Sequence, residues 1–196
     1  MDNEFKLEIN TKNTGKNIEV HVCLRCLEGV CGTVIEKLRE EYEGEDNIED
    51  YMCLVYIKLQ ISMKGRRRKI VMTDFYNNVT KYGRGLSHLS AKLKGGARAI
   101  LCVLLKKAVN GGLIREDDIV ELEASGDLNE EEDEDMTPLI NYYKMLNFRV
   151  KYEEDLESQI ESKSVMMYGI VRKLMDSCVK HEHKVSAELK KIIEQI

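Results

Sequence analysis

Two spacings of apolar residues alternate along this chain, and their order limits the folds that the chain can adopt. Residues of one face recur at every second position in a strand and at every third or fourth position in a helix. Strand-like segments, marked by alternation or by β-branched and aromatic residues, cover 5–27, 51–61, 69–76, 118–124, 148–152 and 165–171. Helical segments cover 30–42, 97–109, 138–146 and 172–196. Because strands and helices intermingle in this way, the sequence predicts one α/β domain.

Turn and cap residues mark the boundaries of these segments. The turn residues Asn13–Lys16 lie inside the strand-like segment 5–27, which predicts a hairpin or a bent first strand. Lys64–Arg68 separates two strand-like segments and predicts a hairpin. Asn110–Gly112 follows the strongest helical segment, where a left-handed glycine would end the helix. Thr137 and Pro138 have the residue types of an N-cap and a first helical position, so a short helix is expected to begin there.

The tail of the chain carries apolar side chains at helical spacing over 172–196. We expect an amphipathic helix there, broken near His181–His183. The sequence shows no internal repeat and no interior linker. We therefore expect one domain over 1–171. We expect the C-terminal helical extension over 172–196 to pack on or beside this domain.

The chain is acidic, with 30 Lys and Arg against 35 Asp and Glu and a net charge of −5. No apolar run approaches the ~20 residues that cross a bilayer, and the first residues lack the apolar core of a signal peptide. We therefore expect a soluble, cytoplasmic protein with no membrane partner. Arg66–Arg68 is expected to be a solvated hairpin tip. Because no aromatic residue interleaves with it, we do not expect a nucleic acid partner.

Six cysteines raise two alternatives, a metal site or buried side chains. Cys23 and Cys26, with His21 and Cys31 nearby, have the spacing of half a zinc site. A structural zinc site needs a second ligand pair at a similar spacing, and the sequence has none, so we expect no metal. Four of the cysteines lie in apolar stretches, where free cysteine behaves as a small buried hydrophobe. Reduced thiols are therefore expected.

A glycine pair, Gly95-Gly96, stands directly before the strongest helical segment, and Ala97 follows it. The first amides of a helix have no partner within it, and the helix dipole favours negative charge there. Glycine also lets a ligand approach the backbone closely. Three cations flank the pair: Lys92, Lys94 and Arg98. The segment therefore predicts a phosphate or diphosphate site, although it matches neither the Walker A pattern nor the G-x-G-x-x-G fingerprint.

Three consecutive segments together resemble a known family. They are LSAKLKGGA over 89–97, IVELEAS over 119–125 and LINYYKMLNF over 139–148. This series resembles the GNAT-type N-acetyltransferases, which carry R/Q-x-x-G-x-G/A before a long helix, then a strand of the type V-x-L-x-A, and then a helix ending in Y-x-K-L-G-F. The resemblance covers residues 85–150. It implies that the domain over 1–171 is acetyltransferase-like, with a mixed, mostly antiparallel sheet flanked by helices.

The resemblance also implies a cofactor and a reaction. The chain would bind acetyl-coenzyme A and transfer its acetyl group to an amine, which is a small molecule or a protein. The backbone of Leu89 and Ala91 would pair with the pantetheine arm. The pyrophosphate would be held by Gly95, Gly96 and Ala97, which we call the glycine segment. Lys92 and Lys94 would stand in the place of the family's Gln or Arg, and Arg98 would add positive charge.

Tyr143 falls on the tyrosine that in this family commonly protonates the departing thiolate. A phenol can share a proton with a thiolate across a short hydrogen bond as the tetrahedral intermediate collapses. The attacking amine must also lose a proton. For that step the candidates are His88 on the strand-like segment 86–91 and Glu121 or Glu123 on the next strand.

Departures from the family pattern leave a second function open. Lys92 replaces the usual Arg or Gln, Asn147 replaces the glycine of the closing motif, and the customary asparagine of the penultimate helix has no clear counterpart. An acidic run over 130–135 also lengthens the connection after the strand. The alternative is a catalytically inactive, acetyltransferase-like protein that binds a partner or a second copy of itself through its sheet and C-terminal helix.

Overall fold

The computed structural model describes residues 5–26, 53–65, 67–77, 93–125 and 135–194, together with the single residues 36, 40 and 43. Within this part of the chain, seven strands form one sheet. They are β1 (Phe5–Asn13), β2 (Asn17–Cys26), β3 (Val55–Lys64), β4 (Arg67–Asn77), β5 (Ile119–Ser125), β6 (Arg149–Val150) and β7 (Ser164–Ile170). Their order is β1-β2-β3-β4-β5-β7-β6, and β4 and β5 are parallel while the other described neighbours are antiparallel. The expected α/β class with a mixed, mostly antiparallel sheet is confirmed.

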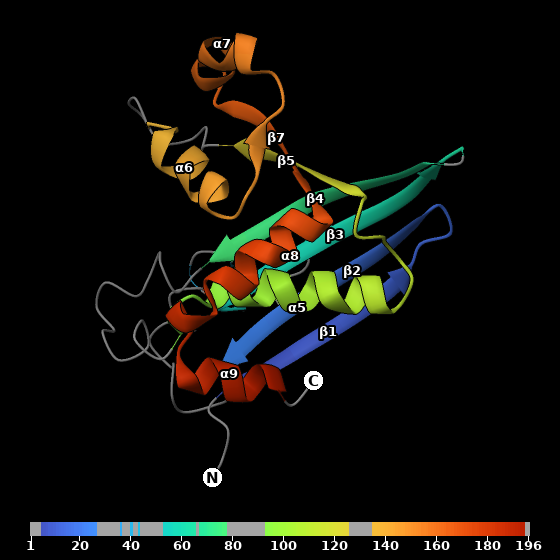
Figure 1. The fold of residues 1–196 in the computed structure, drawn as a ribbon, viewed down its shortest axis with the longest axis vertical. Coiled ribbons are helices and arrows are strands. Elements are labelled where there is room, and N and C mark those ends of the chain that lie inside the picture. Colours follow the sequence, from blue (N-terminus) through green and yellow to red (C-terminus); the bar gives the residue numbers. More distant parts are fainter. Residues whose placement is uncertain are drawn as a thin grey trace.

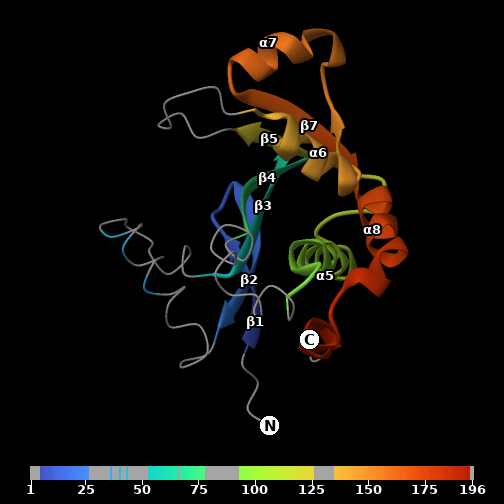
Figure 2. The same cartoon turned by 90° about the vertical axis from the view of Figure 1, so that its left-hand side faces the viewer.

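Three of the described helices lie together on one face of the first strands. The helices whose bounds the structure describes are α5 (Gly96–Asn110), α6 (Thr137–Met145), α7 (Leu156–Glu161), α8 (Val171–Lys180) and α9 (Ala187–Glu194), with 3-10 turns η2 (Glu153–Asp155) and η3 (Glu182–Lys184). The three that lie together are α5, α8 and α9. α5 packs on β2 and β3, and α8 and α9 pack on α5 (Figure 1). Figure 2 shows these three helices on the same side of the sheet. In the ranges that the structure describes, no helix is both long and apolar enough to span a membrane.

Both hairpins form. β1 and β2 pair with Phe5 opposite Cys26, and β3 and β4 pair with Lys64 opposite Arg67. The first turn is closed by the Thr14 amide, which donates to the Asn17 carbonyl oxygen at 2.9 Å. Alternate side chains of these strands are buried against the helical layer, as a strand period of two requires.

α5 forms the centre of the core. It is apolar on most of its circumference, and its buried residues include Ile100, Leu101, Leu104, Leu105 and Ala108. Because parallel strands cannot be joined by a tight turn, α5 also serves as the crossover from β4 to β5. The helix ends after Asn110, and Gly112 has a φ of 69°, the left-handed conformation that the sequence predicts.

Several elements differ from the expectation. α6 begins at Thr137 itself, so Met136 and not Thr137 is the N-cap residue, and the Thr137 amide donates to the Asp135 carboxylate at 2.8 Å. The turn η2 and helix α7 have no predicted counterpart, because only Leu156 and Ile160 repeat at helical spacing in this acidic stretch. The tail is broken as expected, between α8 and α9. The strand predicted over 86–91 lies outside the described residues.

The helix predicted over 30–42 lies mostly outside the described residues as well. Glu36 and Glu40 are described, and both are helical. The strand predicted over 148–152 is reduced to the two residues of β6. The strand predicted over 165–171 is β7, with one residue added before it and one removed at its end.

The cysteines are paired, which corrects the expectation of reduced thiols. Cys23 is bonded to Cys53 and Cys102 to Cys178, and Cys26 is also disulfide-bonded. The partners stand 30 and 76 residues apart in the sequence, and only the packing of β2 beside the start of β3, and of α8 on α5, brings them together. The residues next to each cysteine in the sequence therefore do not indicate which cysteines pair. A sulfur in a disulfide is not a thiolate, so Cys23 is not available as a zinc ligand.

Ser177 on α8 is 5% exposed, and its hydroxyl has no hydrogen-bond partner among the described residues. An unsatisfied buried hydroxyl disfavours the folded state. We expect Ser177→Ala to raise the free energy of unfolding by about 1 kcal/mol in urea denaturation. The control is Ser186→Ala, which should lower it by about 1 kcal/mol, because the Ser186 hydroxyl accepts the Leu189 amide in the first turn of α9. A destabilised Ser177→Ala variant would contradict the expectation.

Candidate functional site

Strands β4 and β5 separate at their C-terminal ends. They pair only over Ile70–Met72 and Val120–Leu122. Immediately after this ladder, Thr73 is an extra residue in β4, because Lys58 lies opposite Asp74 and Leu59 opposite Met72. A bulge of this kind bends a strand and ends its pairing on one side. Past Thr73 the facing edges of β4 and β5 have no strand pairing among the described residues, and Figure 1 shows the two arrowheads apart with α6 nearby.

Aromatic side chains from α6 and β4 meet at this separation. The ring centroid of Phe75 lies 5.8 Å from those of both Tyr142 and Tyr143. The Tyr143 ring also packs edge-on against Phe148 at 6.0 Å. Tyr143 is only 7% exposed. The cluster therefore holds the Tyr143 ring rigidly beside the point where β4 and β5 part.

The environment of the two tyrosines keeps them protonated. Burial raises the pKa of Tyr142 to about 12, although a hydrogen bond with Asn77 and the charge of Arg98 partly oppose the shift. Burial, with Tyr142 as a neighbour, also raises the pKa of Tyr143. Both groups are therefore phenols at neutral pH. Tyr143 can donate a hydrogen bond and does not act as a base, although burial makes it a weaker acid than a free tyrosine.

The N-terminal end of α5, residues 95–98, has the geometry predicted for an anion site, and we call it the head of α5. Gly95 has a φ of 76°, and the Gly96 amide donates to the Leu93 carbonyl oxygen at 2.9 Å. In the described part of the chain, the amides of Ala97 and Arg98 donate no hydrogen bond. No acidic residue lies in the first turn. Two helix amides thus remain available to an anion, as the helix dipole favours.

Arg98 connects the head of α5 to α6. Its guanidinium donates to the Met145 carbonyl oxygen at 2.9 Å. Met145 is the last residue of α6 and lies two positions after Tyr143. The hydrogen bond therefore fixes the glycine segment and the tyrosine helix relative to each other, and it brings the predicted cofactor residues Gly95–Arg98 near the predicted catalytic residue.

The C-terminal segment covers the glycine segment. The Ser186 amide donates to the Lys94 carbonyl oxygen at 3.2 Å. A Cβ atom at Gly95 would lie 3.2 Å from the Lys184 carbonyl oxygen, and one at Gly96 would lie 3.7 Å from a methyl group of Leu189. The close approach that Gly95 permits is therefore made by the chain itself, at residues 184–186.

Glu121 and Glu123, two further predicted site residues, are not brought to Tyr143. Glu121 alternates with the buried residues Val120 and Leu122, so its side chain lies on the face of β5 opposite the core, where the Lys151 ammonium is 2.6 Å away. This ion pair raises the pKa of Lys151. Glu123 lies on the same face and accepts a hydrogen bond from the Ser164 hydroxyl at 2.6 Å. The remaining predicted residues lie outside the described residues: His88, Leu89, Ala91 and Lys92.

Sequence reasoning missed Phe75, Tyr142 and the bulge at Thr73. Tyr142 stands beside Tyr143 in the quoted motif, and the motif itself was a sufficient signal for it. Phe75 lies in a predicted strand, but nothing local indicates that it contacts α6. Among the residues that the structure describes, the site offers two helix amides and two strand edges without hydrogen-bond partners, together with a buried phenol. In comparisons with known proteins, no family model matches this chain and no curated protein matches it.

Proposed function

We propose that this chain is an N-acetyltransferase that moves the acetyl group of acetyl-coenzyme A to an amine by direct attack in a ternary complex. The observation that carries the proposal is the position of Tyr143 at the separation of the parallel strands β4 and β5. The order of elements supports it, because a glycine segment, a long helix, a strand and a tyrosine helix follow one another as the resemblance implies. A cytoplasmic location and the identity of the donor belong to the same proposal.

The proposed reaction uses the groups of the site as follows. The amides of Ala97 and Arg98, which donate no hydrogen bond among the described residues, bind the diphosphate. The edges of β4 and β5 past Thr73, which have no strand partner in the described ranges, offer backbone groups to the extended arm of the donor. The amine nitrogen attacks the thioester carbonyl carbon, and the C–S bond breaks as the tetrahedral intermediate collapses. Tyr143 donates its proton to the departing sulfur, which leaves as the thiol of coenzyme A. The proton that the amine nitrogen loses then returns to the Tyr143 oxygen.

A specific observation favours the second candidate, an inactive protein-binding module. Residues 184–189 lie against the glycine segment, where the diphosphate of the proposed donor would bind. Such a module uses the fold without the cofactor. It would bind a partner or a second copy of the chain through α8 and α9, where Val179 is 64% exposed.

Thermal denaturation with and without acetyl-coenzyme A separates the two functions. At 100 times its dissociation constant, a ligand that binds only the folded state adds about 2.7 kcal/mol to the free energy of unfolding. The matched variant is Gly96→Ala, whose Cβ would find only van der Waals neighbours in the free protein, at 3.7 Å or more. It should keep its own stability and lose most of the response to acetyl-coenzyme A. An unchanged melting temperature of the wild-type protein would favour the inactive module.

A further inference from the structure

We propose that the disulfide between Cys102 and Cys178 is a redox latch that holds the C-terminal segment over the glycine segment, and that a small thiol opens it from an adjoining cavity. The proposal rests on the proposed function, because it concerns the same donor site. It assigns regulation to that site through thiol–disulfide exchange.

The disulfide lies at the start of the covering segment, by which we mean residues 179–194. Cys102 lies in the middle of α5 and Cys178 near the end of α8, so the bond ties the two helices together. The residues that cover the glycine segment follow Cys178 directly in the chain, through η3 and α9. Because the segment begins at the bond, it can leave the head of α5 as one piece when the bond opens.

Besides the disulfide, the described contacts of the covering segment include one hydrogen bond to Lys94, next to the glycine segment, and apolar packing on the core. Its Ser186 amide donates to the Lys94 carbonyl oxygen, and the side chains of Leu189 and Ile192 are buried. α9 has only 8 residues. Helices shorter than ~12 residues are marginal without tertiary packing. Local opening of such a segment is therefore expected once its covalent tether is removed.

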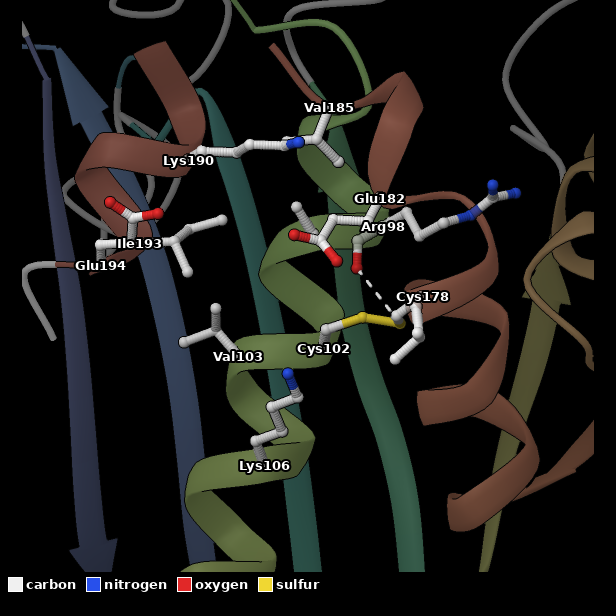
Figure 3. A pocket seen from close by; sticks show the side chains of 12 residues that line it. Arg98, Cys102, Val103, Lys106, Cys178, Glu182, Val185, Lys190, Ile193 and Glu194 are labelled. Carbon is white, nitrogen blue, oxygen red and sulfur yellow. Dashed lines mark hydrogen bonds between the residues drawn. A yellow bond between two sulfur atoms is a disulfide. The ribbon is translucent and has the colours of Figure 1, made fainter. Parts of the chain in front are cut away.

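A cavity of about 160 Å³ leads to the bond. It lies between α5, η3 and α9, and Figure 3 shows the disulfide in its wall. A space of this size admits the reactive end of a small thiol. Cys102 is buried, but Cys178 is only half-buried and both residues line the cavity, so a thiolate would reach the bond at Cys178.

Charges of both signs line the same cavity: Lys106, Lys190, Glu182 and Glu194. Together with apolar walls at Val103 and Ile193, they suit a small zwitterionic thiol that carries an amino and a carboxylate group. Lysine ammonium groups also favour the thiolate form, which is the attacking species.

The exchange is balanced in two steps. The thiolate RS⁻ attacks one sulfur of the disulfide, the S–S bond breaks, and the other cysteine leaves as a thiolate that takes up a proton. A second RSH then attacks the mixed disulfide and releases RSSR. The protein disulfide gains two electrons and becomes two thiols, and two RSH are oxidised to RSSR.

Hydrogen–deuterium exchange of the oxidised and the dithiothreitol-reduced protein tests the latch. Reduction should speed amide exchange in residues 179–194 by about ten-fold or more and leave β7 unchanged. The double variant Cys102→Ser/Cys178→Ser should exchange fast in both conditions. The matched control, Cys23→Ser/Cys53→Ser, removes a disulfide that lies in a separate cluster with Tyr56, and it should respond to reduction as the wild type does. Equal exchange in the oxidised and reduced wild type overturns the proposal.

The affinity for acetyl-coenzyme A, measured in both redox states, distinguishes the latch from the proposed function. The latch predicts that reduction lowers the apparent dissociation constant about ten-fold or more. The reason is that the conformation in which residues 184–189 no longer cover the glycine segment becomes populated. Equal affinity in both states overturns control of the site by the disulfide. If acetyl-coenzyme A binds in neither state while exchange still rises on reduction, the proposed function fails and the latch stands.

Discussion

Replacing Tyr143 with phenylalanine should lower kcat by about 10²–10⁴-fold and leave the dissociation constant of acetyl-coenzyme A nearly unchanged. The change removes only the hydroxyl group. The ring keeps its edge-on packing against Phe75 and Phe148, so the fold and the donor site should persist. Steady-state assays of thiol release, combined with calorimetric titration of acetyl-coenzyme A, measure both quantities.

Tyr142→Phe is the matched control for this experiment. Tyr142 belongs to the same aromatic cluster, and burial raises its pKa as well, but the resemblance gives it no role in catalysis. Its kcat should remain within about three-fold of the wild type, which is ~0.6 kcal/mol of barrier height. If Tyr143→Phe keeps the wild-type rate, Tyr143 has no part in the mechanism. If both variants lose activity equally, the hydroxyl of Tyr143 has no specific role.

Phe148→Ala should lower the free energy of unfolding by about 3–5 kcal/mol. Phe148 is 2% exposed and lies in the main core cluster, and its ring supports that of Tyr143. Truncation to alanine removes apolar burial and leaves a cavity that the rigid surroundings only partly fill. Urea denaturation followed by circular dichroism measures the loss, which is a large part of the total of ~5–15 kcal/mol for a domain.

Met145→Ala is the surface control on the same part of the chain. Its side chain is 60% exposed, and the carbonyl group that accepts Arg98 remains in the variant. The free energy of unfolding should change by no more than about 0.5 kcal/mol. A loss below about 1 kcal/mol in Phe148→Ala would show that Phe148 does not close the core beneath Tyr143.

Local patterns in the sequence predicted most of the described elements. The two hairpins follow from alternation and turn residues, and α5 follows from an apolar run between a glycine pair and Asn110–Gly112. These signals are local because strand and helix periods, caps and turns depend on residues a few positions apart. Helix α7 was not predicted from the sequence, because six residues with two apolar side chains do not define a helical period.

The candidate site was predictable only in part, for the same reason. The glycine segment and Tyr143 stand in motifs of a few residues, so the sequence places them on the head of α5 and on α6. It does not indicate the ion pair of Glu121 with Lys151, because these residues lie on different strands and meet only in the folded sheet. It also does not indicate the bulge at Thr73, which depends on the pairing of β4 with β3.

Periodicity and capping thus specify which stretches of this chain are strands and helices, and the motifs specify which residue types could bind a diphosphate. Long-range packing specifies everything that joins these pieces: the disulfides across 30 and 76 residues, the contact of residues 184–189 with the glycine segment, and the meeting of Phe75 with Tyr143. The physical reason is distance along the chain. A contact between remote residues exists only after the backbone between them has folded, and no local pattern records it.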